Sequence, residues 1–408
     1  MRRVVLLATV VVAVLLACSG VVPAQTEAPA SSQADSPKKT PKNKVRGSYI
    51  VVLKDDEDAG QVAQKKEQKH DLEIKHVYEN ALKGFSAEIP EDQVEAVRNN
   101  PEVEYVEQDS VVRALDQTLP WGIDKIEADL SSTKAGDGSG SVSNVNAYII
   151  DTGIYRTHPD LNVIGHRNFT GDGKNRDCHG HGTHVAGTVA AKDDSNSVVG
   201  TAPGAPLIGV KVLGCNGSGR TSRVIKGIDW VTANADVNGP DNTLGTSDDK
   251  PAVANMSLGG GASRALDDAV RRSASRGVFY AVAAGNDGRN ACNYSPARAG
   301  AGTDNGIVTV AATTSSDREA SWSNHGSCVD LWAPGVNILS TRKGGGTTTM
   351  SGTSMASPHA AAGGGLYLSK QTTASPSTVE SELKSVATTT SNKSKDGGTI
   401  KREYVRGF

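Results

Sequence analysis

The sequence predicts an α/β fold with a mostly parallel central sheet for residues 114–408, with a small α+β domain ahead of it. Residues 145–150 form a largely apolar run without glycine or proline, which is typical of a strand buried on both faces of a parallel sheet. Residues 281–284 form a second such run. The stretch from Val185 is apolar at helical spacing and the stretch after Ser354 is rich in alanine, so both favour helices that alternate with the strands.

The first of these strands leads directly into Asp151, in the motif Asp-Thr-Gly. The carboxyl edge of a parallel sheet is where α/β proteins form their sites, so this carboxylate is a candidate functional group. Taken alone, it is equally well explained as a residue that caps a turn.

His181 begins the motif His-Gly-Thr-His-Val-Ala-Gly and lies near a predicted helix start. There a general base can face a cleft while its helix packs beneath it. His184 comes three residues later and is expected to be structural.

Ser354 lies at the start of an alanine-rich helix, in the motif Gly-Thr-Ser-Met-Ala-Ser-Pro-His. A helix N-terminus offers free N–H groups and positive potential, which favour an anionic tetrahedral intermediate. The simpler reading is a serine that only caps the helix. Asn286 follows the strand at 281–284, where its amide can donate to the same oxyanion, although asparagine after glycine is usually a turn residue.

Asp151, His181 and Ser354 occur in the chain order of the subtilisin triad. Together with Ala-Ala-Gly-Asn at Asn286, their motifs resemble those of the subtilase family of serine peptidases, and more narrowly its proteinase K and aqualysin-like branch. The resemblance covers nearly all of residues 114–408 and implies a subtilisin-like three-layer fold.

The resemblance also implies roles for these residues. Asp151 orients the imidazole, His181 is the general base and acid, Ser354 is the nucleophile, and Asn286 is the oxyanion donor. Two segments match family segments that pair with the substrate backbone, namely Gly217, Ser218, Gly219, Ser257, Leu258 and Gly259. We expect a secreted monomeric endopeptidase that cleaves polypeptides with broad, apolar specificity and without an organic cofactor.

The front of the chain fits an exported precursor. Two arginines and an apolar run over residues 4–17 predict a signal peptide over residues 1–24, so the processed protein should have no membrane anchor. The alternative is a lipidated Cys18. Residues 25–45 are rich in Ala, Ser, Pro, Thr and Lys, and predict a disordered linker.

Residues 46–113 predict the small α+β domain, with strands near 49–53, 84–89 and 103–106 and helices over 59–70 and 91–99. This arrangement is similar to the inhibitory propeptide of the subtilase family, which acts as an intramolecular inhibitor. The alternative is a plain linker domain. Aligning Pro120-Trp-Gly with the mature start of the family places cleavage near Arg113, which puts arginine at the cut of an enzyme expected to favour apolar residues.

Four of the five cysteines remain after the signal peptide, which fits an exported protein. Four cysteines permit three pairings, and the sequence does not choose among them. The resemblance implies the pairs Cys178–Cys215 and Cys292–Cys328. A zinc cluster around Cys178 and the following histidines is the weaker alternative, because paired Cys-x-x-Cys spacing is lacking.

Structural calcium is the one metal that the sequence suggests. Asp330 matches a calcium ligand of the family, although residues 299–306 are longer than usual where the partner carbonyls should lie. The acidic insertion over residues 234–249 is either a second calcium loop or a solvated polar loop.

Other function classes are less consistent with the sequence. A net charge of −2 gives no basic stripe for nucleic acid. An α/β-hydrolase esterase is disfavoured, since Ser354 lacks a Gly-x-Ser-x-Gly elbow. A protease-shaped binding protein is the remaining alternative, if the helical glycines 363–365 or the insertion disable the site.

Overall fold

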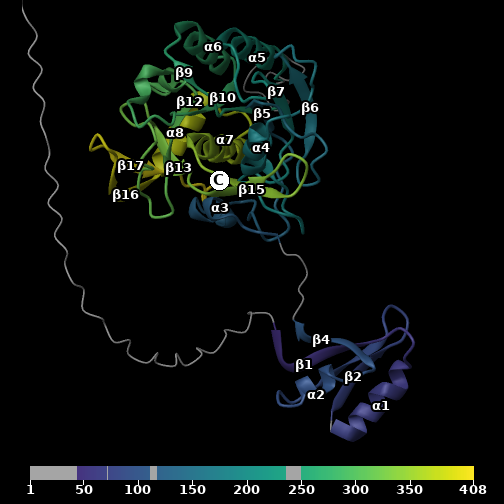
Figure 1. Cartoon of the computed structure of the whole chain (residues 1–408). Coiled ribbons are helices and arrows are strands. Elements are labelled where there is room, and N and C mark those ends of the chain that lie inside the picture. Colours follow the sequence, from purple (N-terminus) through teal and green to yellow (C-terminus); the bar gives the residue numbers. More distant parts are fainter. Residues whose placement is uncertain (1–43, 71, 111–116, 236–249) are drawn as a thin grey trace, which may run out of the picture. The chain divides into compact units, whose positions relative to one another are not determined.

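In the computed structural model the described residues form two compact units, one within residues 1–112 and one within residues 113–408, and both are drawn in Figure 1. The structure describes residues 44–70, 72–110, 117–235 and 250–408. The predicted signal peptide, most of the predicted linker, the predicted cleavage bond and nearly all of the insertion lie outside the described residues.

The first unit contains a four-stranded antiparallel sheet in the order β2-β3-β1-β4, with two helices. Its elements are β1 Lys44–Leu53, α1 Ala59–His70, β2 Glu73–Tyr78, β3 Gly84–Glu88, α2 Val94–Arg98 and β4 Val103–Ser110. Val51, Phe85 and Val97 are fully buried in its core. The unit therefore has its own hydrophobic core, as an independent domain requires.

Two expectations for this unit need correction, and one strand was not expected. The linker does not extend to residue 45, because Lys44 already pairs with Ser110 across the sheet. The second helix begins at Val94 rather than at residue 91, since a turn follows Pro90. Strand β2 was not predicted, because its charged and largely exposed residues carry little of the apolar pattern of a buried strand.

The second unit is built on a nine-stranded sheet in the order β16-β17-β13-β12-β10-β8-β5-β7-β6. All neighbouring strands are parallel except β16 and β17. The strands are β5 Asn146–Asp151, β6 Val163–Asn168, β7 Leu207–Lys211, β8 Ala252–Met256, β10 Val278–Ala283, β12 Ile307–Thr313, β13 Leu331–Pro334, β16 Thr388–Lys393 and β17 Thr399–Arg402. The predicted mostly parallel sheet is therefore confirmed.

Helices cover both faces of this sheet (Figure 1). Because side chains alternate along a strand, Ile149 of β5 packs in the same core as α4 and α7, whereas Tyr148 and Ile150 pack with α5 and α6. The helices are α3 Trp121–Lys125, α4 His181–Ala190, α5 Thr221–Asn234, α6 Arg264–Ala274, α7 Thr353–Lys370 and α8 Pro376–Val386. This gives the expected three layers. No helix among the described residues is long and apolar enough to cross a membrane.

The glycine run in α7 does not interrupt the helix, which continues from Thr353 to Lys370. A Cβ atom on Gly363 would lie 2.5 Å from Oε1 of Glu403, and one on Gly364 would lie 2.5 Å from Cε1 of Phe279. Close packing therefore requires glycine at these two positions, which accounts for residues that are otherwise unfavourable in a helix.

Candidate active site

Three elements of the second unit supply the predicted triad residues. Asp151 is the last residue of β5, His181 is the first residue of α4, and Ser354 is the second residue of α7. Asp151 is fully buried, and its Oδ1 and Oδ2 lie 2.8 Å and 2.9 Å from Nδ1 of His181. This arrangement leaves Nε2 of the imidazole as the atom that can accept a proton.

A buried carboxylate that the sequence analysis missed holds the loop before His181. Asp177 is 2% exposed, and it accepts hydrogen bonds from the backbone N–H groups of His179, Gly180 and Thr183. It lies ahead of α4, where a carboxylate is stabilised by the helix N-terminus. The clue in the sequence was an aspartate four residues before the histidine.

The pKa of His181 is raised above its ordinary value. Burial acts to lower this pKa, but the carboxylates of Asp151 and Asp177 outweigh it by favouring the charged imidazolium. The site therefore stabilises the protonated form that a general base reaches during the reaction.

Ser354 and Asn286 line one cavity of about 320 Å³. Oδ1 of Asn286 accepts hydrogen bonds from N–H and Oγ1 of Thr353, at 2.8 Å and 2.9 Å. This network fixes the orientation of the amide, so that Nδ2 is the end that remains able to donate. Oγ of Ser354 lies 3.3 Å from the carbonyl oxygen of Ser257. In the described part of the chain, Ser354 makes no hydrogen bond to His181.

The predicted substrate-binding residues lie together along a second, larger cavity of about 530 Å³ that also reaches His181. All six of them line it: Gly217, Ser218, Gly219, Ser257, Leu258 and Gly259. The two cavities share residues 258–261, and β9 at Gly260–Gly261 pairs with β11 at Tyr294–Ser295. The backbone of these segments borders both cavities, as strand addition by an extended peptide requires.

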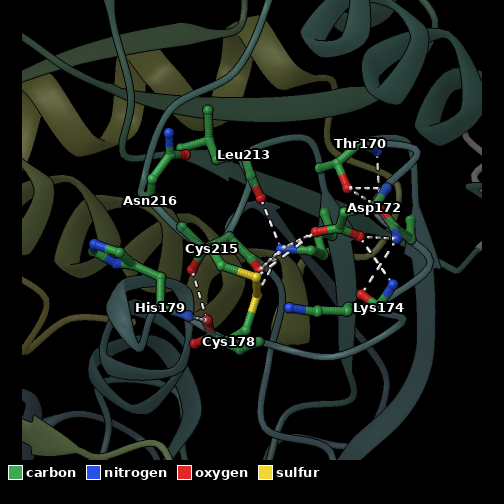
Figure 2. Close-up of a disulfide and its surroundings, with 12 residues drawn as sticks. Thr170, Asp172, Lys174, Cys178, His179, Leu213, Cys215 and Asn216 are labelled. Carbon is green, nitrogen blue, oxygen red and sulfur yellow. Dashed lines mark hydrogen bonds and ion pairs between the residues drawn. A yellow bond between two sulfur atoms is a disulfide. The ribbon is translucent and has the colours of Figure 1, made fainter.

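The disulfide Cys178–Cys215 joins the loop before His181 to the segment at Gly217, and Figure 2 shows its surroundings. Next to it lies Lys211, whose side chain is fully buried. Its Nζ donates to the carbonyl oxygens of Thr152 at 2.9 Å and Leu213 at 2.8 Å. Burial lowers the pKa of Lys211, while nearby carboxylates, with Asp172 the largest, oppose this. Lys211 thus connects Thr152, which follows Asp151, to Leu213, which lines the larger cavity. This role was not predicted from the sequence.

The zinc alternative is not supported. A metal site needs several ligand atoms close together. Among the described residues, three or more His, Cys, Asp or Glu side chains bring their ligand atoms within 4.8 Å of one another only at Asp172, Cys178 and Cys215. Both cysteines are in the disulfide and cannot offer thiolates. Nε2 of the fully buried His184 hydrogen-bonds to the carbonyl of Ile338 at 3.0 Å, as a structural residue does. The second disulfide joins Cys292 and Cys328.

The residues around Asp330 do not fit a calcium ion. Oδ2 of Asp330 accepts the N–H of Thr309 at 2.8 Å, and its Oδ1 lies 3.7 Å from Nζ of Lys384. Calcium needs six to eight oxygen ligands, and a positively charged ammonium already lies among the acidic groups here. The expectation of a calcium ligand at Asp330 is therefore not supported by its surroundings.

Comparison with known proteins agrees with this geometry. A sequence model of the subtilase family matches residues 143–407, and a model of the peptidase inhibitor I9 family matches residues 48–115. The chain is 44% identical over 327 residues to an extracellular serine proteinase of Thermus sp. (strain Rt41A). The aligned region covers 77% of this chain and 73% of that protein. It is 42% identical over 337 residues to alkaline serine exoprotease A of Vibrio alginolyticus, and this aligned region covers 78% of this chain but 58% of that protein.

A solved structure, that of a cold adapted subtilisin-like serine proteinase, is also similar. It has 41% sequence identity and a TM-score of 0.59, and the match covers 70% of this chain and 97% of that one. The sequence match, the parallel sheet and the paired Asp151 and His181 lead to one conclusion: this chain belongs to the subtilase family of serine peptidases and carries an I9-type propeptide.

Proposed function

We propose that this subtilase hydrolyses peptide bonds with Asp151, His181 and Ser354 as its catalytic triad. The observation that carries the proposal is the pair of contacts, 2.8 Å and 2.9 Å, between the Asp151 carboxylate and Nδ1 of His181 at the carboxyl edge of the sheet. A buried carboxylate at this distance holds the imidazole in the tautomer whose Nε2 accepts a proton.

The reaction begins when Oγ of Ser354 attacks the scissile carbonyl carbon and its proton moves to Nε2 of His181. Nδ2 of Asn286 and the N–H of Ser354 donate to the oxyanion of the tetrahedral intermediate. The imidazolium then gives its proton to the leaving amine, which leaves an acyl-enzyme. Water, deprotonated by His181, attacks this ester and releases the second product.

The substrate is an extended polypeptide that adds as a strand along residues 217–219 and 257–259. Both segments line the cavity that reaches His181, and their glycines let another backbone approach closely. The small side chains of Ala283 and Ala284 leave room beside Ser354 for a substrate side chain. These features support a broad endopeptidase specificity.

The protein is made as a secreted monomeric precursor in which residues 44–113 are an intramolecular inhibitor that the active site removes near Arg113. Support comes from the I9 match over residues 48–115 and from the separate hydrophobic core of the first unit. A relative named as an extracellular serine proteinase supports export through the signal peptide at residues 1–24.

The test is the intact mass of secreted wild-type protein and of Ser354→Ala, each with and without a serine-directed covalent inhibitor. Wild type should lose the residues up to about 113 and gain one inhibitor, whereas Ser354→Ala should keep its propeptide and stay unlabelled. Ser351→Ala changes a serine three residues away and should behave as wild type. A wild-type protein that folds by circular dichroism, stays full length and takes up no inhibitor would instead make it an inactive, protease-shaped binding protein.

A further inference from the structure

A lysine ammonium lies among three carboxylates at the side of the sheet formed by β12 and β13. Lys384 of α8 forms ion pairs with Asp304, with Oε1 of Glu380 at 3.1 Å and with Oδ1 of Asp330 at 3.7 Å. Asp304 precedes β12, Asp330 immediately precedes β13, and Glu380 is on α8 itself. One side chain therefore bridges three separate segments of the chain.

The carboxylate oxygens that face away from Lys384 also have donors. Glu380 is fully buried, and its Oε2 accepts the N–H groups of Asn305 at 2.7 Å and Gly306 at 2.8 Å. Oδ2 of Asp330 accepts the N–H of Thr309 at 2.8 Å. Buried carboxylates are stable only when they are paired and hydrogen-bonded in this way.

The nearby carbonyl oxygens, which a divalent cation would also need, are occupied by donors. The carbonyl of Ala299 accepts Nε of Arg271 at 3.0 Å and Nδ2 of Asn305 at 3.1 Å. The carbonyl of Ala297 accepts Oγ1 of Thr309 at 2.7 Å. Calcium binds through oxygen lone pairs, so these N–H and O–H donors and the ammonium compete with it directly.

We infer that Lys384 replaces a divalent cation at Asp330, so that the ammonium cross-links α8 to residues 304–306 and to the start of β13 without a metal. The ammonium is covalently part of the chain, so unlike a bound metal ion it cannot diffuse away. The stability of this region should therefore be independent of calcium. This inference concerns folding and does not rest on the proposed catalytic function.

The test uses the full-length Ser354→Ala protein as parent, because it cannot digest itself. Lys384→Gln is added to it, and the melting temperature is measured in a chelator and in millimolar calcium chloride. In the chelator the variant should melt roughly 5–15 °C below the parent, because the three carboxylates lose the one cation that pairs with them among the described residues. The same difference should be found in calcium chloride, because the oxygens around Asp330 keep their N–H and O–H donors when the lysine is replaced. Lys226→Gln, on the exposed surface of α5, is the matched control and should melt with the parent.

A second variant keeps the inference open to failure even if Lys384→Gln does not fold. Asp330→Asn should bind as much calcium per molecule as the parent, measured by elemental analysis after equilibrium dialysis. If the parent binds one more calcium ion than Asp330→Asn, Asp330 is a metal ligand and the inference is wrong. It is also wrong if Lys384→Gln folds and melts with the parent in the chelator, since the ammonium would then not cross-link these segments.

Discussion

At the scale of single residues, His181 shows how the environment sets the reactivity of a side chain. Its imidazole is 21% exposed, faces the cleft and is held by Asp151, while the charge of Asp177, which was not expected from the sequence, also raises its pKa. Asp177 was missed because a carboxylate that binds backbone N–H groups has no fixed motif of its own. The same is true of Lys211, whose role depends on the pairing of β5 with β7.

The first prediction concerns the pH dependence of catalysis. His181 must be neutral to accept the proton of Ser354, and its pKa is raised above 6.5, so kcat/KM should fall as the pH drops through a value above 6.5. The measurement is kcat/KM for a neutral peptide substrate across the pH range. His179→Gln, which changes the neighbouring exposed histidine, should leave this acidic limb in place. An acidic limb well below pH 6 in wild type would contradict the assignment.

A second residue-scale prediction concerns the fully buried His359, whose pKa burial lowers to about 4. In the unfolded chain this histidine takes up a proton near pH 6.5, so the stability from its neutral form is present above pH 6.5 and is lost as the pH falls towards 4. The contribution is on the order of 3 kcal/mol. In the Ser354→Ala background, the unfolding free energies of the parent and of His359→Gln should therefore converge over this range.

The matched control for this experiment is His179→Gln, because His179 is exposed. Its difference from the parent should stay constant over the same pH range. A difference for His359→Gln that is constant between pH 6.5 and 4 would show that His359 is not held neutral in the folded protein.

At the scale of elements, α7 offers a test of the glycine run. An alanine at Gly364 would place its Cβ 2.5 Å from Phe279, whereas the nearest neighbours of a Cβ at Gly365 are 3.9 Å away. Gly364→Ala should therefore destabilise the protein by about 1–3 kcal/mol through overpacking. Gly365→Ala should be neutral or stabilising by up to about 1 kcal/mol. Denaturant unfolding in the Ser354→Ala background measures both, and equal effects would contradict the packing explanation.

The two disulfides form a natural pair for comparison, since their sequence separations are 37 and 36 residues. Chain entropy alone predicts that either double-serine variant loses about 4 kcal/mol of stability. Only Cys178–Cys215 joins the loop before His181 to the segment at Gly217, so only its loss should also lower kcat. Denaturant unfolding and steady-state kinetics of the two variants provide the comparison. A similar loss of kcat in both would show that the first disulfide has no special role in the site.

The sequence predicted the elements of the site better than those around it. The strand before Asp151 and the helices that begin at His181 and Ser354 were found because apolar runs and glycine-flanked motifs are local signals. Helices α5 and α6 were not predicted, and their role depends on which face of the sheet they cover. Strand order is also a tertiary property, so the neighbours of β5 could not be deduced from the chain.

At the scale of the whole molecule, the chain combines two units with separate cores and separate sheet types. The change from an antiparallel sheet to a parallel one follows the change in sequence from charged, alternating strands to continuous apolar runs. The I9 and subtilase matches fall on the same two parts of the chain. The division of the molecule was therefore predictable, whereas the ion-pair network that holds its last helix was not.

The contact between Gly364 and Phe279 has a consequence for how this family can change over evolutionary time. The two residues are 85 positions apart by their numbering, yet a larger side chain at one requires a smaller side chain at the other. Relatives with alanine in place of the glycine should therefore carry a smaller residue than phenylalanine on β10, and the two substitutions should appear together in their descent. An aligned set of subtilases in which the two positions vary independently would show that the helix and the strand have other ways to accommodate each other.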